Sequence, residues 1–218
     1  MKKIFAIVLA AALFAGTNAF AQIYPGAGYI NSTLSGQYNG NAITPEQSNG
    51  FYAGASYNVG LSGGLSVAPG LYFSMITNTN EGSGGVSGIA TVNSKTVFTE
   101  MALNVPVMAN YSYALTRDAK VFAYAGPTFQ LGLSSKAVNN TNADTVVGSG
   151  SSNSTKDYYA DGDYNKFNIY VGGGIGAEFA KILIVLGYDY GVMNLYAGST
   201  ENTYYHRANL HLGVGYAF

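Results

Sequence analysis

The chain has 218 residues, of which 10% are charged, against about 25% in soluble domains. A net charge of −1, without clustered Lys or Arg, excludes nucleic acid as a partner, because neutralising phosphates needs such clusters. Cys is absent, which excludes disulfide bonds, whereas Gly and Tyr are abundant at 29 and 19 residues. The length fits one domain.

The N-terminus has the pattern of a secretory signal peptide, residues 1–21. Lys2 and Lys3 precede an apolar core, and Ala19 and Ala21 are the small residues that a signal peptidase reads. The alternative, a retained anchor, is disfavoured because the apolar run is shorter than the roughly 20 residues of a spanning helix. We therefore expect cleavage after Ala21 and a single mature domain, residues 22–218. Removing two Lys from the 10 basic residues leaves 8 against 11 acidic ones, a net charge of −3.

Eight segments of the mature domain are predicted to be β-strands. They are 26–36, 49–60, 64–77, 97–114, 120–135, 166–180, 182–194 and 203–218. Short turns alternate with longer connections rich in Asn, Ser, Thr, Gly and Asp: 37–48, 78–96, 136–165 and 195–202. Short turns at one end and long polar loops at the other are typical of a bacterial outer-membrane barrel.

The last strand shows how side chains alternate between two faces. Its apolar face consists of Leu210, Leu212, Val214, Tyr216 and Phe218, whereas Arg207, Asn209 and His211 lie on the other face. A soluble lipocalin-like barrel also alternates, but its polar face would be rich in charges. Here the polar face of the last five strands has only four formal charges: Glu100, Glu178, Asp189 and Arg207. We therefore predict an all-β fold, an eight-stranded antiparallel transmembrane β-barrel with its apolar face in lipid.

Four stretches resemble the small outer-membrane β-barrel proteins often labelled porin-family, similar in plan to the OmpA transmembrane domain and OmpX. They are Leu103-Asn104-Val105-Pro106-Val107, Tyr124-Ala125-Gly126-Pro127, Gly172-Gly173-Gly174-Ile175-Gly176 and the terminal residues 210–218. The resemblance implies location in a bacterial outer membrane, with short periplasmic turns and long extracellular loops. It also implies that Leu210, Leu212, Val214, Tyr216 and Phe218 form the signal read by the barrel-assembly machinery.

The expected function is that of an integral outer-membrane protein, structural and surface-exposed, monomeric and surrounded by membrane lipid. An eight-stranded barrel is just wide enough for its own side chains, so we do not expect a general diffusion pore. Two alternatives stay open. One is adhesion or recognition of a surface ligand or host factor through loops 78–96 and 136–165; the other is a narrow selective pore. We expect no enzymatic activity and no cofactor, because the lipid-side His206 has no Ser partner at a useful spacing.

The inward charges predict a polar network in the lumen, made of Glu100, Asp189, Arg207, His211 and Glu178. If the last loop centres near residue 198, Asp189 and Arg207 lie opposite each other, and we expect them to form an ion pair. Glu100 or His211 would join this pair through water. The competing interpretation is a gated ion path lined by the same groups.

One long loop carries a weak candidate for a calcium site. Asp157, Asp161 and Asp163 place three carboxylates around a Gly, and carboxylate oxygens are ligands that Ca²⁺ prefers. The loop lacks the closing Glu of an EF-hand, and an ordinary solvated loop explains the pattern too. Tyr158, Tyr159 and Tyr164 in the same loop could equally form a contact surface for a ligand.

Overall fold

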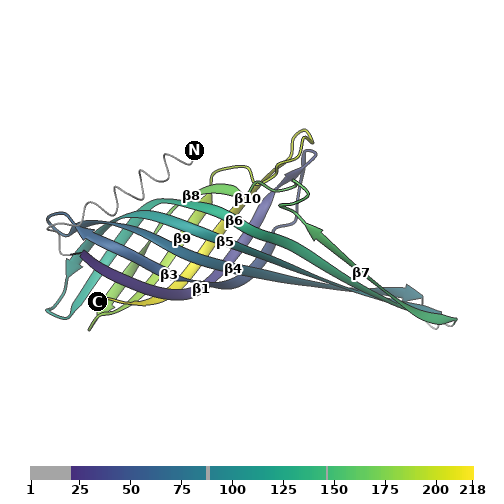
Figure 1. Ribbon diagram of the computed structural model, residues 1–218, viewed down its shortest axis with the longest axis horizontal. Helices are drawn as coiled ribbons and strands as arrows, with labels where there is room; N and C mark the ends of the chain where they lie inside the picture. Colours follow the sequence, from purple (N-terminus) through teal and green to yellow (C-terminus); the bar gives the residue numbers. More distant parts are fainter. Residues whose placement is uncertain (1–20, 87–88, 146) are drawn as a thin grey trace.

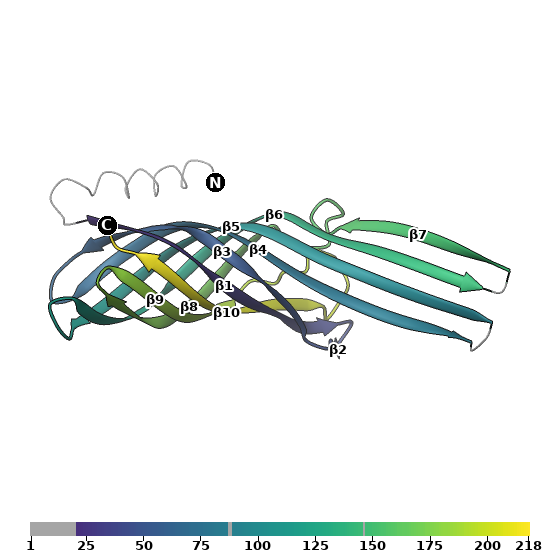
Figure 2. The same cartoon turned by 90° about the horizontal axis from the view of Figure 1, so that it is seen from below.

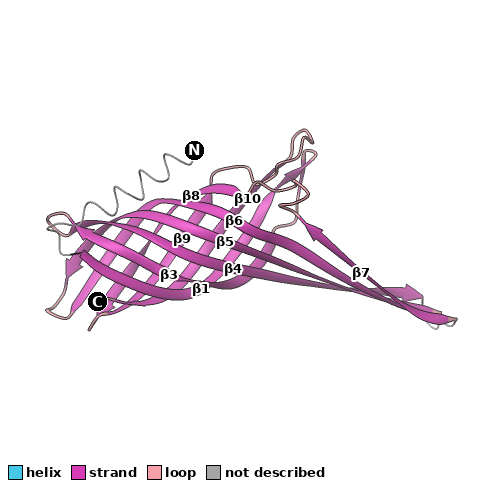
Figure 3. Cartoon of the chain, in the orientation of Figure 1, coloured by secondary structure: helices cyan, strands magenta, loops and turns pink. Residues whose placement is uncertain are grey.

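The computed structural model describes residues 21–86, 89–145 and 147–218 (Figure 1). The expected signal peptide lies outside these residues except for Ala21. Strands make up most of the described chain, as Figure 3 shows. None of the described residues forms a helix long and apolar enough to cross a bilayer.

Eight long strands form one antiparallel ring. They are β1 (Ala21–Tyr38), β3 (Glu46–Gly60), β4 (Leu65–Val86), β5 (Ala90–Ala114), β6 (Ala119–Thr145), β8 (Phe167–Phe179), β9 (Ile182–Gly191) and β10 (Tyr204–Tyr216). Two shorter strands lie outside the ring: β2 (Asn41–Ala42) pairs with β1, and β7 (Gly148–Asp157) pairs with β6. Each of the eight predicted strands corresponds to one ring strand, so the predicted eight-stranded barrel is confirmed.

The ring closes where the last strand meets the first. β10 and β1 pair in an antiparallel register from Gly26↔Gly215 to Gln37↔Tyr204. Backbones come close along this seam, since a Cβ on Gly28 would lie 2.2 Å from the carbonyl oxygen of Leu212. Closure removes the free edges that an open sheet would expose to lipid.

The outer face of the ring is apolar and exposed, and the inner face is polar and buried. Side chains predicted to face lipid remain highly exposed, for example Ile175 at 63% and Phe218 at 69%. A soluble barrel would bury this face, so the predicted outward orientation is confirmed. Aromatic side chains lie on the outer face near both ends: Tyr111, Tyr113 and Tyr216 near one, and Tyr190 and Tyr204 near the other. This placement suits the two membrane–water interfaces.

Three short turns connect strands at the end of the barrel where β1 begins and β10 ends, here called the turn end. The turn between β8 and β9 has only Ala180 and Lys181, with φ of 47° and 75°. Positive φ at both positions is the geometry of a type I′ hairpin, whose twist matches that of the flanking strands. This tight connection holds the inward residues of β8 and β9 in register.

The structure corrects the prediction for loops 78–96 and 136–165, which are mostly strand. Parts of four strands continue past the barrel, and we call them the protruding sheet. They are residues 78–86 of β4, 90–98 of β5, 137–145 of β6 and 148–156 of β7. The register runs unbroken across it, from Asn78↔Phe98 to Phe98↔Ala137 and Ala137↔Lys156. Figures 1 and 2 show these four strands extending as one arm beyond the end of the barrel opposite the turn end, here called the loop end. Small polar side chains suit water as well in a two-sided solvated strand as in a loop, so composition could not separate the two.

Candidate functional site

A buried ion pair spans the lumen at the loop end. Arg207 of β10 is bonded to Glu100 of β5, and their side chains are only 4% and 2% exposed. β5 and β10 lie four strands apart in both directions around the ring, so the pair joins opposite walls. Ser135 donates a further hydrogen bond to Glu100 at 3.5 Å. Both residues belong to the predicted lumen network, and the pair acts as a strut across the barrel.

The predicted ion pair between Asp189 and Arg207 is wrong. Asp189 lies opposite Asn209, two residues further along β10 than expected, because the β9–β10 connection centres later in the chain. Its Oδ2 atom is 3.5 Å from Nδ1 of His211 instead. Glu100, predicted to join through water, contacts Arg207 directly.

A segment of the long β7–β8 connection closes the loop end above the strut. Tyr159 is 7% exposed and fits against Gly132, where a Cβ would lie 2.2 Å from its hydroxyl oxygen. Tyr158 stacks on Tyr164 with ring centroids 4.6 Å apart. Of the three tyrosines predicted to form a contact surface, Tyr159 is thus a plug.

The three candidate calcium ligands do not gather. Asp157 accepts hydrogen bonds from the backbone N–H groups of Tyr159 and Ala160 at 3.2 and 3.1 Å. These bonds, that of Ala160 foremost, hold the pKa of Asp157 below its usual value. Asp163 pairs with Lys156 at 2.7 Å. No group of three or more acidic or His side chains in the described part of the chain is arranged to hold a metal ion, so the calcium prediction is wrong.

Below the strut, a polar layer crosses the barrel. Tyr170 donates to Gln130 at 3.3 Å, Gln130 to Asn104 at 3.0 Å, and Asn104 to Ser74 at 2.8 Å. These bonds link four strands, β8, β6, β5 and β4. The layer separates the loop half of the lumen from the turn half.

The turn half contains a second ion pair, between Glu178 and Lys120 at 2.7 Å. Glu178 was predicted to point inward, which is confirmed. The sequence analysis missed Lys120. This residue lies an even number of positions from Tyr124 on β6, so the alternation of side chains places both on the inner face. Lys120 also lies 3.4 Å from the hydroxyl of Tyr24. Its side chain is 30% exposed, so water reaches the lumen from the turn end.

His211, also predicted to point inward, belongs to an aromatic cluster. Its Nε2 atom is 3.0 Å from the hydroxyl of Tyr124, and its ring makes an edge contact with Tyr52 at 5.9 Å. Glycines make room for this cluster, since a Cβ on Gly174 or Gly187 would lie 2.6 or 2.3 Å from the Tyr124 hydroxyl oxygen. The glycines of the polar face therefore accommodate a tyrosine from a strand one or two places away in the ring.

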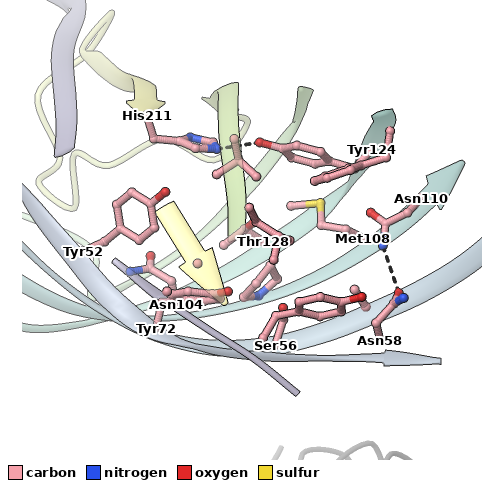
Figure 4. A pocket seen from close by; sticks show the side chains of 18 of the residues that line it. Tyr52, Ser56, Asn58, Tyr72, Asn104, Met108, Asn110, Tyr124, Thr128 and His211 are labelled. Carbon is pink, nitrogen blue, oxygen red and sulfur yellow. Dashed lines mark hydrogen bonds between the residues drawn. The ribbon is translucent and has the colours of Figure 1, made fainter. Parts of the chain in front are cut away.

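Together these groups line a cavity of about 230 Å³ in the turn half. Figure 4 shows Tyr52 and Tyr72 along one side of it, with His211 and Tyr124 joined by their hydrogen bond on another. Met108 and Thr128 line it between them. The cavity is thus mixed in character, with aromatic and apolar surface interrupted by a few polar groups.

The lipid-side His206 is held by local contacts. Its Nδ1 donates to the carbonyl oxygen of Gly191 at 2.9 Å, and its ring stacks on Tyr190 at 5.6 Å. The five residues of the expected assembly signal all lie on the outer face, between 42% and 69% exposed: Leu210, Leu212, Val214, Tyr216 and Phe218.

Comparison with known proteins gives a family and a set of distant structures. Residues 14–197 match the family model described as outer membrane protein beta-barrel domain. No curated protein matches the chain. Among solved structures, Ail of Yersinia pestis in complex with the heparin analogue sucrose octasulfate is 14% identical, with a TM-score of 0.43, covering 91% of this chain and 99% of that one.

Two further barrels are similarly distant. Neisserial surface protein A is 17% identical with a TM-score of 0.42, covering 90% of this chain and 97% of that one. The N-terminal β-barrel domain of Pseudomonas aeruginosa OprF is 12% identical with a TM-score of 0.32, covering 88% and 97%. Likeness at this level says nothing about what this chain binds.

Proposed function

The chain belongs to the outer membrane protein beta-barrel domain family, and we propose that this integral outer-membrane barrel is a rigid base for surface recognition by its protruding sheet. The sheet would bind an extended polypeptide segment as an additional strand. The observation that supports this proposal most is the sheet itself, four paired strands that continue past the closed ring.

The protruding sheet has two long edges. β3 pairs with β4 only as far as Asn49↔Thr77, so residues 78–85 have a partner on one side alone among the described strands. In the same part of the chain, β7 pairs with β6 and with no other strand. Natural proteins usually blunt such edges with Pro, bulges or charges, because exposed main-chain groups pair readily with other chains. Here residues 149–155 have none of these, which favours strand addition.

The sheet's composition suits recognition through the main chain. Residues 148–155 are Gly, Ser, Asn and Thr and are all exposed, so the edge is accessible and offers little apolar surface for aggregation. Backbone pairing along all four strands and a cross-strand hydrogen bond, which Ser94 donates to Asn139 at 3.1 Å, stiffen the arm. A stiff edge loses little conformational entropy when a partner strand binds.

Removing the arm should abolish recognition and leave the barrel intact. Asn80, Thr96, Asn139 and Ser154 lie at one level in the register, so deleting 81–95 and 140–153 and closing each hairpin with Asn-Gly shortens all four strands equally. Peptides enriched by the full chain from a phage-displayed 12-residue library should lose measurable binding to this variant. When these peptides bind to the full chain, they should slow amide hydrogen exchange at residues 149–156 or 78–85 of its protruding sheet.

The control is a variant with residues 197–201 shortened, which keeps the protruding sheet and should bind as the full chain does. Heat-modifiable gel mobility checks that both variants form barrels. Failure to enrich any peptide, or equal binding to the truncated arm, would contradict the proposal.

We propose that the lumen does not conduct ions. The strut, Tyr159 and the polar layer fill the loop half, with Ser135 fully buried and Asn168 1% exposed. In planar bilayers we expect the chain to give no stepwise conductance above that of the bare membrane. The double variant Glu100→Ala/Arg207→Ala, which removes the strut, is the comparison. Reproducible unitary steps from the unaltered chain would favour the narrow pore instead.

We also propose that Phe218 and the alternate residues before it are recognised during barrel assembly, because they form a continuous exposed apolar strip. The proposal includes no catalysis. The contacts of His206 with Gly191 and Tyr190 support a packing role for this side chain, not that of a base.

A further inference from the structure

The cavity in the turn half of the lumen has one accessible end. Its mouth is marked by Lys120 and Glu178, whose side chains are 30% and 14% exposed, against 4% and 2% for the strut. The turn end faces the periplasm in this family. At about 230 Å³, the cavity exceeds the roughly 150 Å³ that accommodates benzene in an engineered protein cavity. A small molecule entering from the periplasm therefore fits, at the end of the molecule opposite the protruding sheet.

The cavity lining carries one negative charge in excess. Lys120 and Glu178 neutralise each other at 2.7 Å, which leaves the carboxylate of Asp189. His211 does not compensate for it. We assign to His211 the neutral tautomer in which Nε2 accepts from the Tyr124 hydroxyl and Nδ1 carries the proton. Its 3.5 Å separation from Asp189 is too long for a strong hydrogen bond.

Two buried acceptors in this lining have no donor. Within the described part of the chain, neither Oδ1 of Asp189 nor Oδ1 of Asn209 has a hydrogen-bond partner. The two residues are directly opposite each other on β9 and β10, and Asn209 is only 7% exposed. Buried polar atoms are nearly always paired, and a buried carboxylate needs a cation or several donors. Oδ1 of Asp189 lies against Gly172 of β8, so a donor in the cavity reaches this carboxylate through the 14% of its side chain that is exposed.

The rest of the lining is aromatic. Tyr52 and Tyr72 meet edge to face at 5.8 Å, and Tyr124 and Tyr170 line the cavity with them. Tyrosine faces attract cations through the ring quadrupole, and several rings beside one carboxylate form the usual recognition site for organic ammonium groups. An inorganic cation would gain much less from the rings, since its strong hydration opposes entry into an apolar site.

We propose that the turn-half cavity binds a small organic cation from the periplasm, with its ammonium group at Asp189 and its apolar body among the tyrosines. Recognition would rest on the carboxylate and the rings together. This site is independent of the protruding sheet, so either proposal can fail alone.

The test uses the purified full chain in nonionic micelles at pH 8, with calorimetric titration of benzyltrimethylammonium. We expect saturable binding at one site per chain, and none for phenylacetate, which has the opposite charge. Asp189→Asn should weaken binding about tenfold or more, because a charge-assisted contact becomes a neutral one. Glu81→Gln, the same change at an exposed position on the protruding sheet, should leave the affinity unchanged.

Gel mobility after heating shows whether Asp189→Asn still folds. If it does not, Ala68→Phe provides the second variant, since Ala68 lines the cavity and is 9% exposed. Filling the space there should abolish binding while leaving Asp189 in place. Equal affinity for benzyl alcohol, an unchanged affinity in Asp189→Asn, or competition by K⁺ at equal concentration would each overturn the proposal. So would the absence of saturable binding, which would leave a water-filled cavity only.

Discussion

Breaking the strut should cost more stability than any other single change in the lumen. Glu100→Gln leaves the Arg207 guanidinium buried without a counter-ion, and Arg207→Met leaves the Glu100 carboxylate in the same state. Each should lower the free energy of unfolding by about 3–5 kcal/mol, the range for an unpaired buried charge. Equilibrium urea unfolding of the barrel in lipid vesicles, followed by gel mobility and circular dichroism, measures this effect.

The double variant Glu100→Gln/Arg207→Met should be less destabilised than the sum of the two single variants. Removing both charges removes the desolvation cost that each single variant retains, so the coupling energy should be large. The exposed pair Lys95–Glu81 is the control, with side chains 53% and 65% exposed, and it should show no measurable coupling. Additive losses at Glu100 and Arg207 would show that the pair is not a strut.

The sequence predicted which side chains of each strand point into the lumen, but it did not predict which of them contact each other there. Alternation alone predicted that Glu100, Glu178, Asp189, Arg207 and His211 point inward, because the side-chain period of a strand is two. Which of them meet depends on register. Moving the pairing of β9 and β10 by two residues shifts one side chain by about 6–7 Å along its strand, which is enough to exchange ion-pair partners.

Contacts between opposite walls are still less accessible from sequence. Glu100 and Arg207 are on strands that never pair, and their contact depends on the stagger of all eight strands. The sequence prediction used only the centre of the β9–β10 loop, which carries no information on the stagger of the other strands. The polar pattern therefore predicted that these five side chains point inward, but it missed Lys120 and gave Asp189 the wrong partner.

The protruding sheet was missed for a different physical reason. Segments such as residues 78–85 and 149–155 lack the apolar alternation that identifies a half-buried strand, because both faces of the arm meet water. Their strand conformation derives from hydrogen bonds to neighbours already aligned by the barrel. Each added residue pair extends a hydrogen-bond ladder that the barrel has already started, so a low intrinsic β-propensity does not prevent strand formation here.

The outer face offers the second large effect. Leu210 lies on β10 midway between the aromatic side chains Tyr204 and Tyr216, and is 49% exposed. At this depth, Leu210→Lys places an ammonium group near the bilayer centre and should lower the unfolding free energy by about 2–4 kcal/mol. Leu210→Ala separates the lost apolar contact from the added charge.

The depth dependence distinguishes lipid from any other apolar surrounding. Ile182 also points outward and is 55% exposed, but it lies opposite Tyr216 at the turn end, in the interfacial region. There a Lys side chain can reach water, so Ile182→Lys should cost only about 0–1 kcal/mol. A protein–protein contact covering the same face would penalise both charges alike. Equal losses at Leu210 and Ile182, measured by urea unfolding in vesicles, would therefore argue against a lipid-facing seam.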